Sequence, residues 1–385
     1  MVKIASFNVE NLFERPKAFH ATDLTVGQPA LDAYREVNIL IKNPIYSPAD
    51  RLRIRELLVI LDIYSIDAQG VIRRKQTLEP KWAWLRKNRG TFDREPQDTT
   101  QNVEIIANGR GDWIGWIELA KEPTNEIGTR TTARVIQEVN ADILGIVEAE
   151  DRPSLVRFNE ELLGGQYGHS MLVDGNDERG IDVGIMTKTG FNIESICSHV
   201  DTVDAIGTIF SRDCAQYEIS TASGTVIHIL VNHFKSQSGG GGNKRRRQAT
   251  KVREIADGLM QQGKHVVVMG DLNEGPVAGG TQALNLASLY DNNSSLIDCY
   301  SLGGFDVGNR PGSFDSCGLS NRLDYIFISQ SLQASFTGGG LFRKGLWGSR
   351  VTRPPVATHW QTYPEMTASV EQASDHAAAF VDLDI

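Results

Sequence analysis

Short apolar runs separated by polar stretches dominate the chain, and they predict more strands than helices. Lys3–Val9 alternates like a strand, whereas Ile143–Val147 and His265–Met269 are continuous apolar runs typical of buried strands. Further strands are predicted over Ile181–Thr187, Gly224–Val231, Asp324–Ile328 and Ala377–Leu383. Many strands with few helices between them favour two sheets packed face to face with helices outside, rather than a doubly wound parallel sheet.

Three segments have helical periodicity. Thr129–Val139 places Ala133, Ile136 and Val139 on one face. Lys244–Gln262 predicts an amphipathic helix, with Arg245, Arg246 and Arg253 expected away from the buried stripe that is formed by Ala249, Val252, Ile255, Ala256, Leu259 and Met260. Pro48–Ile63 has a similar pattern, and the glycine-rich Ser238–Asn243 predicts a flexible loop.

A long segment separates the first strand from the strands that follow it. We expect residues 1–13 and 127–385 to form one domain and residues 14–126 to form an insertion, because ~110 residues far exceed an ordinary loop. Lys81–Arg89 interleaves basic and aromatic residues, and Trp82 and Trp84 would suit base stacking or a small core equally. The insertion follows the strand that carries Asn8 and Glu10, so we expect a substrate lid or clamp.

Composition narrows the possible functions only slightly. The formal net charge is −9, which does not fit a protein that coats nucleic acid in bulk but is compatible with a metal-dependent nuclease. No apolar run is long enough for a membrane span, so we expect no membrane partner. The four cysteines lack the spacing of a zinc site. No signal peptide is visible, which predicts a cytoplasmic protein, with secretion as the alternative.

Four phrases place chemically active residues at or just past an apolar run. They are SFNVENLF (Ser6–Phe13), VNHFKS (Val231–Ser236), GDLNEGP (Gly270–Pro276) and SDHAAAF (Ser374–Phe380). Glu148 and Asp324 occupy similar positions. Catalytic groups of α/β sheets gather at the carboxyl ends of strands, so these phrases are expected to converge. Carboxylates and carboxamides suit hard cations, and histidines can carry protons.

Taken in order, these phrases resemble the endonuclease/exonuclease/phosphatase superfamily, which includes the DNase I-like nucleases. The phrase NHFKS, followed by an Arg-rich helix, and RGIDVGI (Arg179–Ile185) are nearest to bacterial nucleases with an NHFKS-type motif. The resemblance covers Met1–Phe13 and about Thr129–Ile385. It implies an α/β fold, a four-layer α/β/β/α sandwich (DNase I-like) with a large insertion after the first strand.

The resemblance also implies roles for individual residues. Glu148 would hold Mg²⁺, with Mn²⁺ as a substitute, helped by Asn8, Glu10 and Asp375. The proposed catalytic set is His233, Asp271, Asn273, Asp324 and His376. In that set Asp271 and His376 would prepare a water, and Asp324 would orient His376. Asn273 would contact phosphate, and His233 would protonate the leaving oxygen or steady the charge of the transition state. His376 is alternatively a donor to phosphate.

Several polar and basic residues are candidates for binding substrate phosphates. They are Asn232, Arg179, Lys235, Lys244, Arg245, Arg246 and Arg247. An ion pair with Asp177 or Glu178 is an equal alternative for Arg179, and the basic run can also be a solvated helix start. We expect hydrolysis of nucleic acid, specifically a DNA endonuclease that uses in-line attack by an activated water. The alternatives are a lipid or small-molecule phosphoesterase on the same site and a non-catalytic binding protein.

Overall fold

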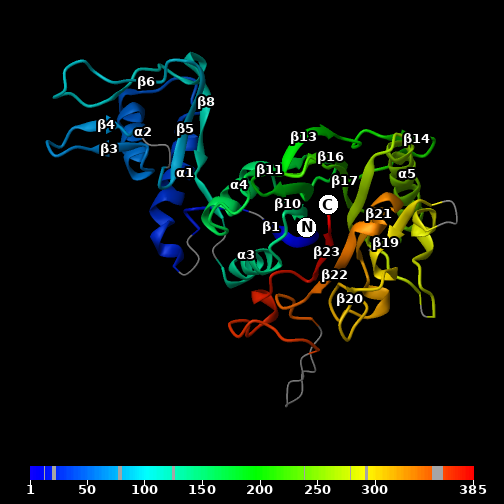
Figure 1. Cartoon of the computed structure of the whole chain (residues 1–385). Coiled ribbons are helices and arrows are strands. Elements are labelled where there is room, and N and C mark those ends of the chain that lie inside the picture. The colour runs from blue at the N-terminus through cyan, green and yellow to red at the C-terminus, as the bar shows by residue number, and fades with distance from the viewer. Residues whose placement is uncertain are drawn as a thin grey trace. The chain divides into compact units, whose positions relative to one another are not determined.

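The computed structural model describes residues 1–12, 14–19, 23–76, 80–123, 126–237, 239–277, 279–290, 294–348 and 359–385 (Figure 1). The chain divides into two compact units, one formed by Met1–Phe13 with Asn125–Ile385 and the other by Glu14–Thr124. We call the first the catalytic unit and the second the insertion. Each has hydrophobic clusters of its own.

The catalytic unit contains two large sheets. The seven-stranded sheet has the order β11 (His169–Val173), β12 (Asp182–Thr187), β10 (Ile143–Ala149), β1 (Val2–Leu12), β23 (Ala378–Leu383), β22 (Phe336–Phe342) and β20 (Phe305–Asp306). The six-stranded sheet has the order β13 (Asn192–Cys197), β16 (Cys214–Ser220), β17 (Val226–His233), β18 (His265–Asp271), β21 (Asp324–Ser329) and β19 (Leu296–Asp298). Each strand predicted from the sequence overlaps one of these strands.

The sheets pack face to face through one shared core. Ile4 and Ile143 of the first sheet and Ile229 and Val267 of the second are fully buried in the same cluster. Helices α3 (Ile127–Val139) and α4 (Arg152–Glu161) pack on the other side of the seven-stranded sheet, and α5 (Gly242–Gln261) covers the six-stranded sheet (Figure 1). The result is the predicted four-layer α/β/β/α sandwich.

Two arginines of α5 differ from the expectation. Arg245 and Arg253 are only 6% and 8% exposed, although both were expected away from the buried stripe. Their guanidinium groups are neutralised locally, because Arg245 pairs with Glu274 and Arg253 pairs with Asp257. A buried arginine is tolerated when its charge is paired and its hydrogen bonds are made.

The insertion is built from two helices and small antiparallel sheets. Helices α1 (Gln28–Leu40) and α2 (Pro48–Ile60) pack around Val37, Ile54 and Trp113. Ser47 and Asp50 form a capping box that starts α2. The paired strands are β2 (Glu14–Pro16) with β9 (Lys121–Pro123), β3 (Tyr64–Ile66) with β4 (Ile72–Arg74), β5 (Ala83–Gly90) with β8 (Trp113–Leu119), and β6 (Asp93–Arg94) with β7 (Glu104–Ile105).

The remaining elements are short. Strands β14 (Val203–Asp204) and β15 (Gly207–Thr208) form a small hairpin in the catalytic unit. The 3₁₀ helices are η1 (Leu24–Val26), η2 (Arg110–Asp112), η3 (Leu284–Leu289), η4 (Cys299–Ser301), η5 (Leu319–Asn321), η6 (Gln330–Ser335) and η7 (Ser369–Glu371). Each helix in the described part of the chain is too short or too polar to cross a membrane.

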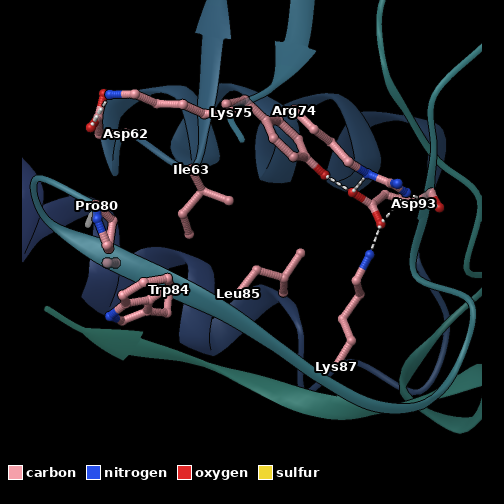
Figure 2. A pocket seen from close by; sticks show the side chains of 11 residues that line it. Asp62, Ile63, Arg74, Lys75, Pro80, Trp84, Leu85, Lys87 and Asp93 are labelled. Carbon is pink, nitrogen blue, oxygen red and sulfur yellow. Dashed lines mark hydrogen bonds and ion pairs between the residues drawn. The ribbon is translucent and has the colours of Figure 1, made fainter. Parts of the chain in front are cut away.

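A buried carboxylate ties together the strands of the insertion. Asp93 accepts hydrogen bonds from Tyr64 Oη at 2.6 Å, Arg74 Nε at 2.8 Å and Lys87 Nζ at 2.8 Å (Figure 2). Burial alone would raise the pKa of Asp93, but these hydrogen bonds together hold it below its ordinary value. The four side chains line one end of a cavity of about 160 Å³.

Candidate active site

Strand directions bring the predicted residues to one edge of the two sheets. Strand β1 runs parallel to β10, and β17 runs parallel to β18, so Asn8, Glu148, His233 and Asp271 lie near strand ends that face the same way. The neighbouring β21 and β23 run antiparallel to them. Asp324 is therefore the first residue of its strand. The prediction that it lies at or just past an apolar run is wrong. His376 likewise precedes β23 and bridges to Phe314.

Asp271 lies at the centre of this edge. Its Oδ2 accepts hydrogen bonds from Asn273 Nδ2 at 3.0 Å and from Asn8 Nδ2 at 3.3 Å. The same oxygen is 3.6 Å from His233 Nε2 and 3.8 Å from His376 Nε2. Burial, together with the charges of Asp324 and Glu148, raises the pKa of Asp271 to about 7. The carboxylate is thus positioned between both histidines.

His376 is held in place by Asp324. Its Nδ1 lies 2.7 Å from Asp324 Oδ2, and that oxygen also accepts a hydrogen bond from Ser313 Oγ at 2.6 Å. Nε2 remains directed to the carboxylates of Asp271 and Asp375, each 3.8 Å away. Burial alone would lower the pKa of His376, but the surrounding carboxylates raise it to about 10. His376 is therefore a cation and a hydrogen-bond donor.

His233 has the opposite electrostatic environment. Its Nε2 is 3.5 Å from Glu148 Oε1, and its buried Nδ1 has no hydrogen-bond partner among the described residues. Burial and the positive charges of Arg212 and His376 hold the pKa of His233 well below its usual value. A neutral imidazole at this position accepts or relays a proton more readily than it donates one.

Acidic groups gather next to the histidines. Glu148 and Asp375 line a cavity of about 300 Å³. Burial raises the pKa of Glu148, and the charge of Asp375 adds to this shift. The carboxylate of Glu10 accepts hydrogen bonds from the Asp375 backbone and from Gln372 Nε2, the latter at 3.3 Å. Asn8 completes the group through a hydrogen bond to Glu148 and another from the Glu10 backbone.

Three predicted site residues have unusual backbone conformations. Glu10, Glu148 and Asn273 have φ angles of 51°, 69° and 55°. The left-handed region is disfavoured for residues with a side chain, and it is found repeatedly where function holds the backbone under strain. At Glu148 the conformation coincides with a register shift between β10 and β12. The local irregularity lets a strand residue turn its carboxylate toward the cavity.

Arg212 is a site residue that the sequence did not reveal. Its side chain is 2% exposed, lines the cavity, donates to the Phe234 carbonyl at 2.6 Å and pairs with Asp177 at 3.2 Å. Arg179 lines the same cavity and pairs with Asp177 at 2.9 Å, so the alternative of an ion pair is correct. Arg179 is 65% exposed and retains free donors toward solvent. Two guanidinium groups thus flank the acidic cluster.

Asn232 lies away from the cavity. It is fully buried, and residues alternate along β17, so its side chain points to the face opposite His233 and shares that face with Leu230. Its Nδ2 donates to the Leu230 carbonyl at 3.0 Å. The expectation that Asn232 contacts phosphate or orients His233 is therefore wrong.

The basic run of α5 is mostly engaged in ion pairs. Arg245 is buried against Glu274 and donates to three backbone carbonyls, and Arg247 forms a double ion pair with Asp204, so neither guanidinium is available to phosphate. Arg246 is exposed and donates to Asn285 at 2.9 Å. Lys235 Nζ donates to Ser236 at 3.1 Å.

Lys244 differs from its neighbours because other cations surround it. Burial and the charges of Arg247, Arg212 and Lys235 lower its pKa. These cations repel one another, and an anion bound among them would offset that repulsion. Lys244 and Lys235 therefore stay candidates for binding phosphate, together with Arg246.

The donor set fits a hard divalent cation. Glu148, Asp375 and Glu10 offer carboxylate oxygens, and Asn8 retains one carbonyl lone pair. Donor atoms of Asp271, Asp324 and His376 also lie within 4.8 Å of one another. In that second group, however, Asp324 Oδ2 is occupied by His376 and Ser313. The cation site predicted around Glu148 therefore stays a prediction, beside this second group.

The sequence of this chain matches one known family. Residues 89–338 match the model of a family described as "Endonuclease/Exonuclease/phosphatase family". No curated protein matches the chain in sequence. Similar solved structures include a Bacteroides thetaiotaomicron mannosyl-6-phosphatase (18% identity, 67% of this chain and 92% of that one, TM-score 0.48). The family match, rather than such distant structures, establishes the relationship.

Two further structures resemble the chain to a similar degree. Truncated Caenorhabditis elegans TDP2 has 18% identity over 68% of this chain and 92% of its own, with a TM-score of 0.47. The catalytic domain of human Nocturnin with bound sulfate has 16% identity over 66% and 85%, with a TM-score of 0.46.

Proposed function

Because the chain belongs to the endonuclease/exonuclease/phosphatase family, whose members hydrolyse phosphoester bonds, we propose that it is a metal-dependent phosphodiesterase acting on DNA as an endonuclease. One observation carries the proposal: Glu148, Asp271, His233 and His376 line one cavity. A nucleophile of the serine or cysteine type is not needed, since a water can attack the phosphorus directly.

The cation site is assigned to Glu148 and Asp375, with Glu10 and Asn8 beside them. Mg²⁺ bound there would polarise the phosphate and stabilise the departing oxygen, and Mn²⁺ would serve the same purpose. At Glu148, burial and the strained backbone limit the movement of the carboxylate. The negative charges of the ligand residues also require a cation to balance them once the site is closed by substrate.

The remaining residues divide the work of in-line hydrolysis. Asp271 accepts a proton from the attacking water and is oriented by Asn273 and Asn8. His376, a cation fixed by Asp324, donates to a phosphate oxygen and supplies a proton to the leaving oxygen. This division takes up the alternative in which His376 donates to phosphate, and it gives the proton of the leaving oxygen to His376 rather than to His233. His233 is uncharged and instead steadies Asp271 and Glu148.

The choice of nucleic acid is supported by the cations around the cavity. Arg212 and Arg179 line it, and Lys244 lies close enough to Arg212 for that charge to lower its pKa. Arg179 is exposed enough to contact a phosphate oxygen, Arg212 adds positive charge behind it, and additional cations suit a substrate with several phosphates in series. A substrate with a single phosphate would use only the first two.

Supercoiled plasmid provides the direct test. We expect nicking in Mg²⁺ or Mn²⁺ and none in EDTA, with the product separated on an agarose gel. Intact plasmid, combined with release of phosphate or phosphocholine from small esters, would replace the DNA proposal with the lipid or small-molecule phosphoesterase. Failure on every substrate would favour a non-catalytic binding protein.

A further inference from the structure

One exposed face of the insertion is not used by the proposed reaction. It is the outer face of the two-stranded sheet formed by β5 and β8. The register pairs Trp84 with Glu118, Arg86 with Trp116 and Arg89 with Ile114, and partners in such pairs lie on the same face. We call these six residues the outer face of the ribbon; Trp84, at the start of β5, also lines the cavity of the insertion.

Exposure alternates cleanly along β8. Trp113 and Ile117 are 2% and 1% exposed and belong to the core of the insertion. Ile114 and Trp116 point the other way and are 52% and 46% exposed. An indole and a branched aliphatic side chain left adjacent in solvent form an apolar surface suited to a ligand.

Cations flank these apolar side chains. Arg86 stacks on Trp84, with 4.6 Å between the guanidinium carbon and the ring centroid, and pairs with Glu118. The side chain of Arg89 makes no hydrogen bond or ion pair with any residue that the structure describes, although its backbone pairs with Ile114. The outer face therefore carries two arginines against one carboxylate.

The inner side of the same strand has the opposite character. Lys87 and Arg74 are both bound to Asp93, and Lys75 is bound to Asp62 at 2.6 Å (Figure 2). These inner cations are neutralised by carboxylates of the insertion and hold its strands together. The outer face, in contrast, leaves positive charge next to the exposed Trp116 ring, so the two sides of β5 separate a structural role from a binding role.

We propose that the outer face of the ribbon binds single-stranded nucleic acid. A base stacks on Trp116, and the backbone phosphates on either side lie against Arg86 and Arg89. A duplex keeps its bases paired inside and offers no ring for Trp116, whereas any unpaired base does. The charge of Arg89 favours a polyanion over a neutral protein surface. The choice of occupant rests on the proposed nuclease function, because an enzyme of DNA would gain from a second grip on its substrate.

Binding can be measured apart from cleavage. We suggest using the full chain with Glu148→Gln, in EDTA, and a fluorescent oligothymidylate followed by anisotropy. Trp116→Ala should weaken binding about tenfold without changing the salt dependence, because stacking carries no charge. Arg89→Ala should also weaken binding and reduce the slope of log Kd against log salt by about 0.7, the value for one phosphate contact on a single strand.

Matched variants separate the surface from general effects. Phe19 is 45% exposed in the insertion but lies off the ribbon, so Phe19→Ala should bind as the parent does. Arg94 pairs with Glu104, and Arg94→Ala should leave the salt slope unchanged. Trp116→Phe keeps a ring and should retain most of the affinity. Circular dichroism of each variant checks that the insertion remains folded.

The outcomes distinguish this inference from the proposed function. Equal oligothymidylate binding by Trp116→Ala, Arg89→Ala and their Glu148→Gln parent would overturn the inference, whether or not the unmodified chain nicks plasmid. The inference would also be overturned if Trp116→Ala and Arg89→Ala lost binding to anionic phosphatidylserine vesicles while their oligothymidylate binding stayed unchanged. If the unmodified chain cleaves no DNA in Mg²⁺ or Mn²⁺ but Trp116→Ala weakens oligothymidylate binding in the Glu148→Gln background, the nuclease is rejected and the inference stands.

Discussion

The two units of this chain handle charge in opposite ways. The insertion has 17 Lys and Arg against 16 Asp and Glu, whereas the catalytic unit has 22 against 32. In the insertion the buried Asp93 is surrounded by donors that satisfy it. In the catalytic unit the carboxylates of Glu148, Asp271 and Asp375 face one another and their pKa values rise through burial.

The difference teaches how to tell a structural cluster of charges from a chemical one. A structural cluster balances its charges within the protein and stabilises the fold. A chemical cluster leaves charge unbalanced, because an ion or substrate supplies the balance during function. By this criterion the proposed active site belongs to the second kind. The predicted role of residues 14–126 as a lid or clamp stays a prediction.

The largest expected effect concerns Glu148. Glu148→Gln keeps the shape of the side chain but removes the charge that the cation needs, and we expect the nicking rate to fall roughly a thousandfold. Glu150→Gln, two residues further along and outside the described lining of the cavity, should change it less than threefold. Full activity of Glu148→Gln would show that this carboxylate does not hold the ion.

Asp93 should matter for folding and not for the chemistry. Asp93→Asn leaves Arg74 and Lys87 without their full counter-charge. We expect the free energy of unfolding of the insertion to fall by about 3 kcal/mol. This value is at the lower end for a broken buried ion pair, because both cations are partly exposed. Hydrogen exchange followed by mass spectrometry would show faster exchange in the insertion alone.

The exposed ion pair of Glu56 with Arg53 provides the control for that measurement. Glu56→Gln should change the stability of the insertion by less than about 0.5 kcal/mol, as is usual for surface pairs. If Asp93→Asn were equally harmless, the carboxylate would not be a structural centre. If it slowed exchange, the insertion would be strained by Asp93 rather than held by it.

A smaller effect is expected from pH. The pKa of Asp271 is raised to about 7 and that of His376 to about 10, so between pH 6.5 and 8.5 the folded catalytic unit still binds protons that the unfolded chain has largely released. Its stability without metal should therefore fall as pH rises through this window, by about 2 kcal/mol.

The insertion should respond in a different window. The folded pKa of Asp93 is lowered, so its contribution is present above the ordinary carboxyl pKa of about 4 and is lost only as pH falls below that value. Hydrogen exchange in EDTA at pH 6.5 and 8.5, corrected for the intrinsic exchange rate, compares both units in one sample. Equal responses of the two units would contradict the distinction between their charge clusters.

Local patterns in the sequence predicted most of the scaffold. Continuous apolar runs such as Val266–Met269 mark buried strands, because both faces of such a strand are covered. Helix α2 was predicted to reach Ile63 but ends at Ile60, since the chain turns there into β3. Of the two interpretations of the tryptophans, base stacking or a small core, the core fits Trp82, which packs against the hydrophobic core of the insertion. Trp84 lines the cavity of the insertion.

Long-range pairing limited the prediction of the site. Arg212 looked like an ordinary basic residue because its partner Asp177 is 35 positions away. Arg245 seemed to belong to a solvated run because Glu274 lies on another segment. The prediction for Asn232 failed because Asn232 and His233 were treated as one unit that faces the site. Neighbouring residues of a strand point in opposite directions.

The left-handed backbone at Glu10, Glu148 and Asn273 has a consequence for attempts to make this protein more heat-resistant. A glycine would adopt these φ angles without steric conflict, so selection for a higher Tm alone should favour glycine there. The same replacement deletes the acid or amide on which turnover is proposed to depend. Thermal screening without an activity assay would thus enrich durable but inert molecules.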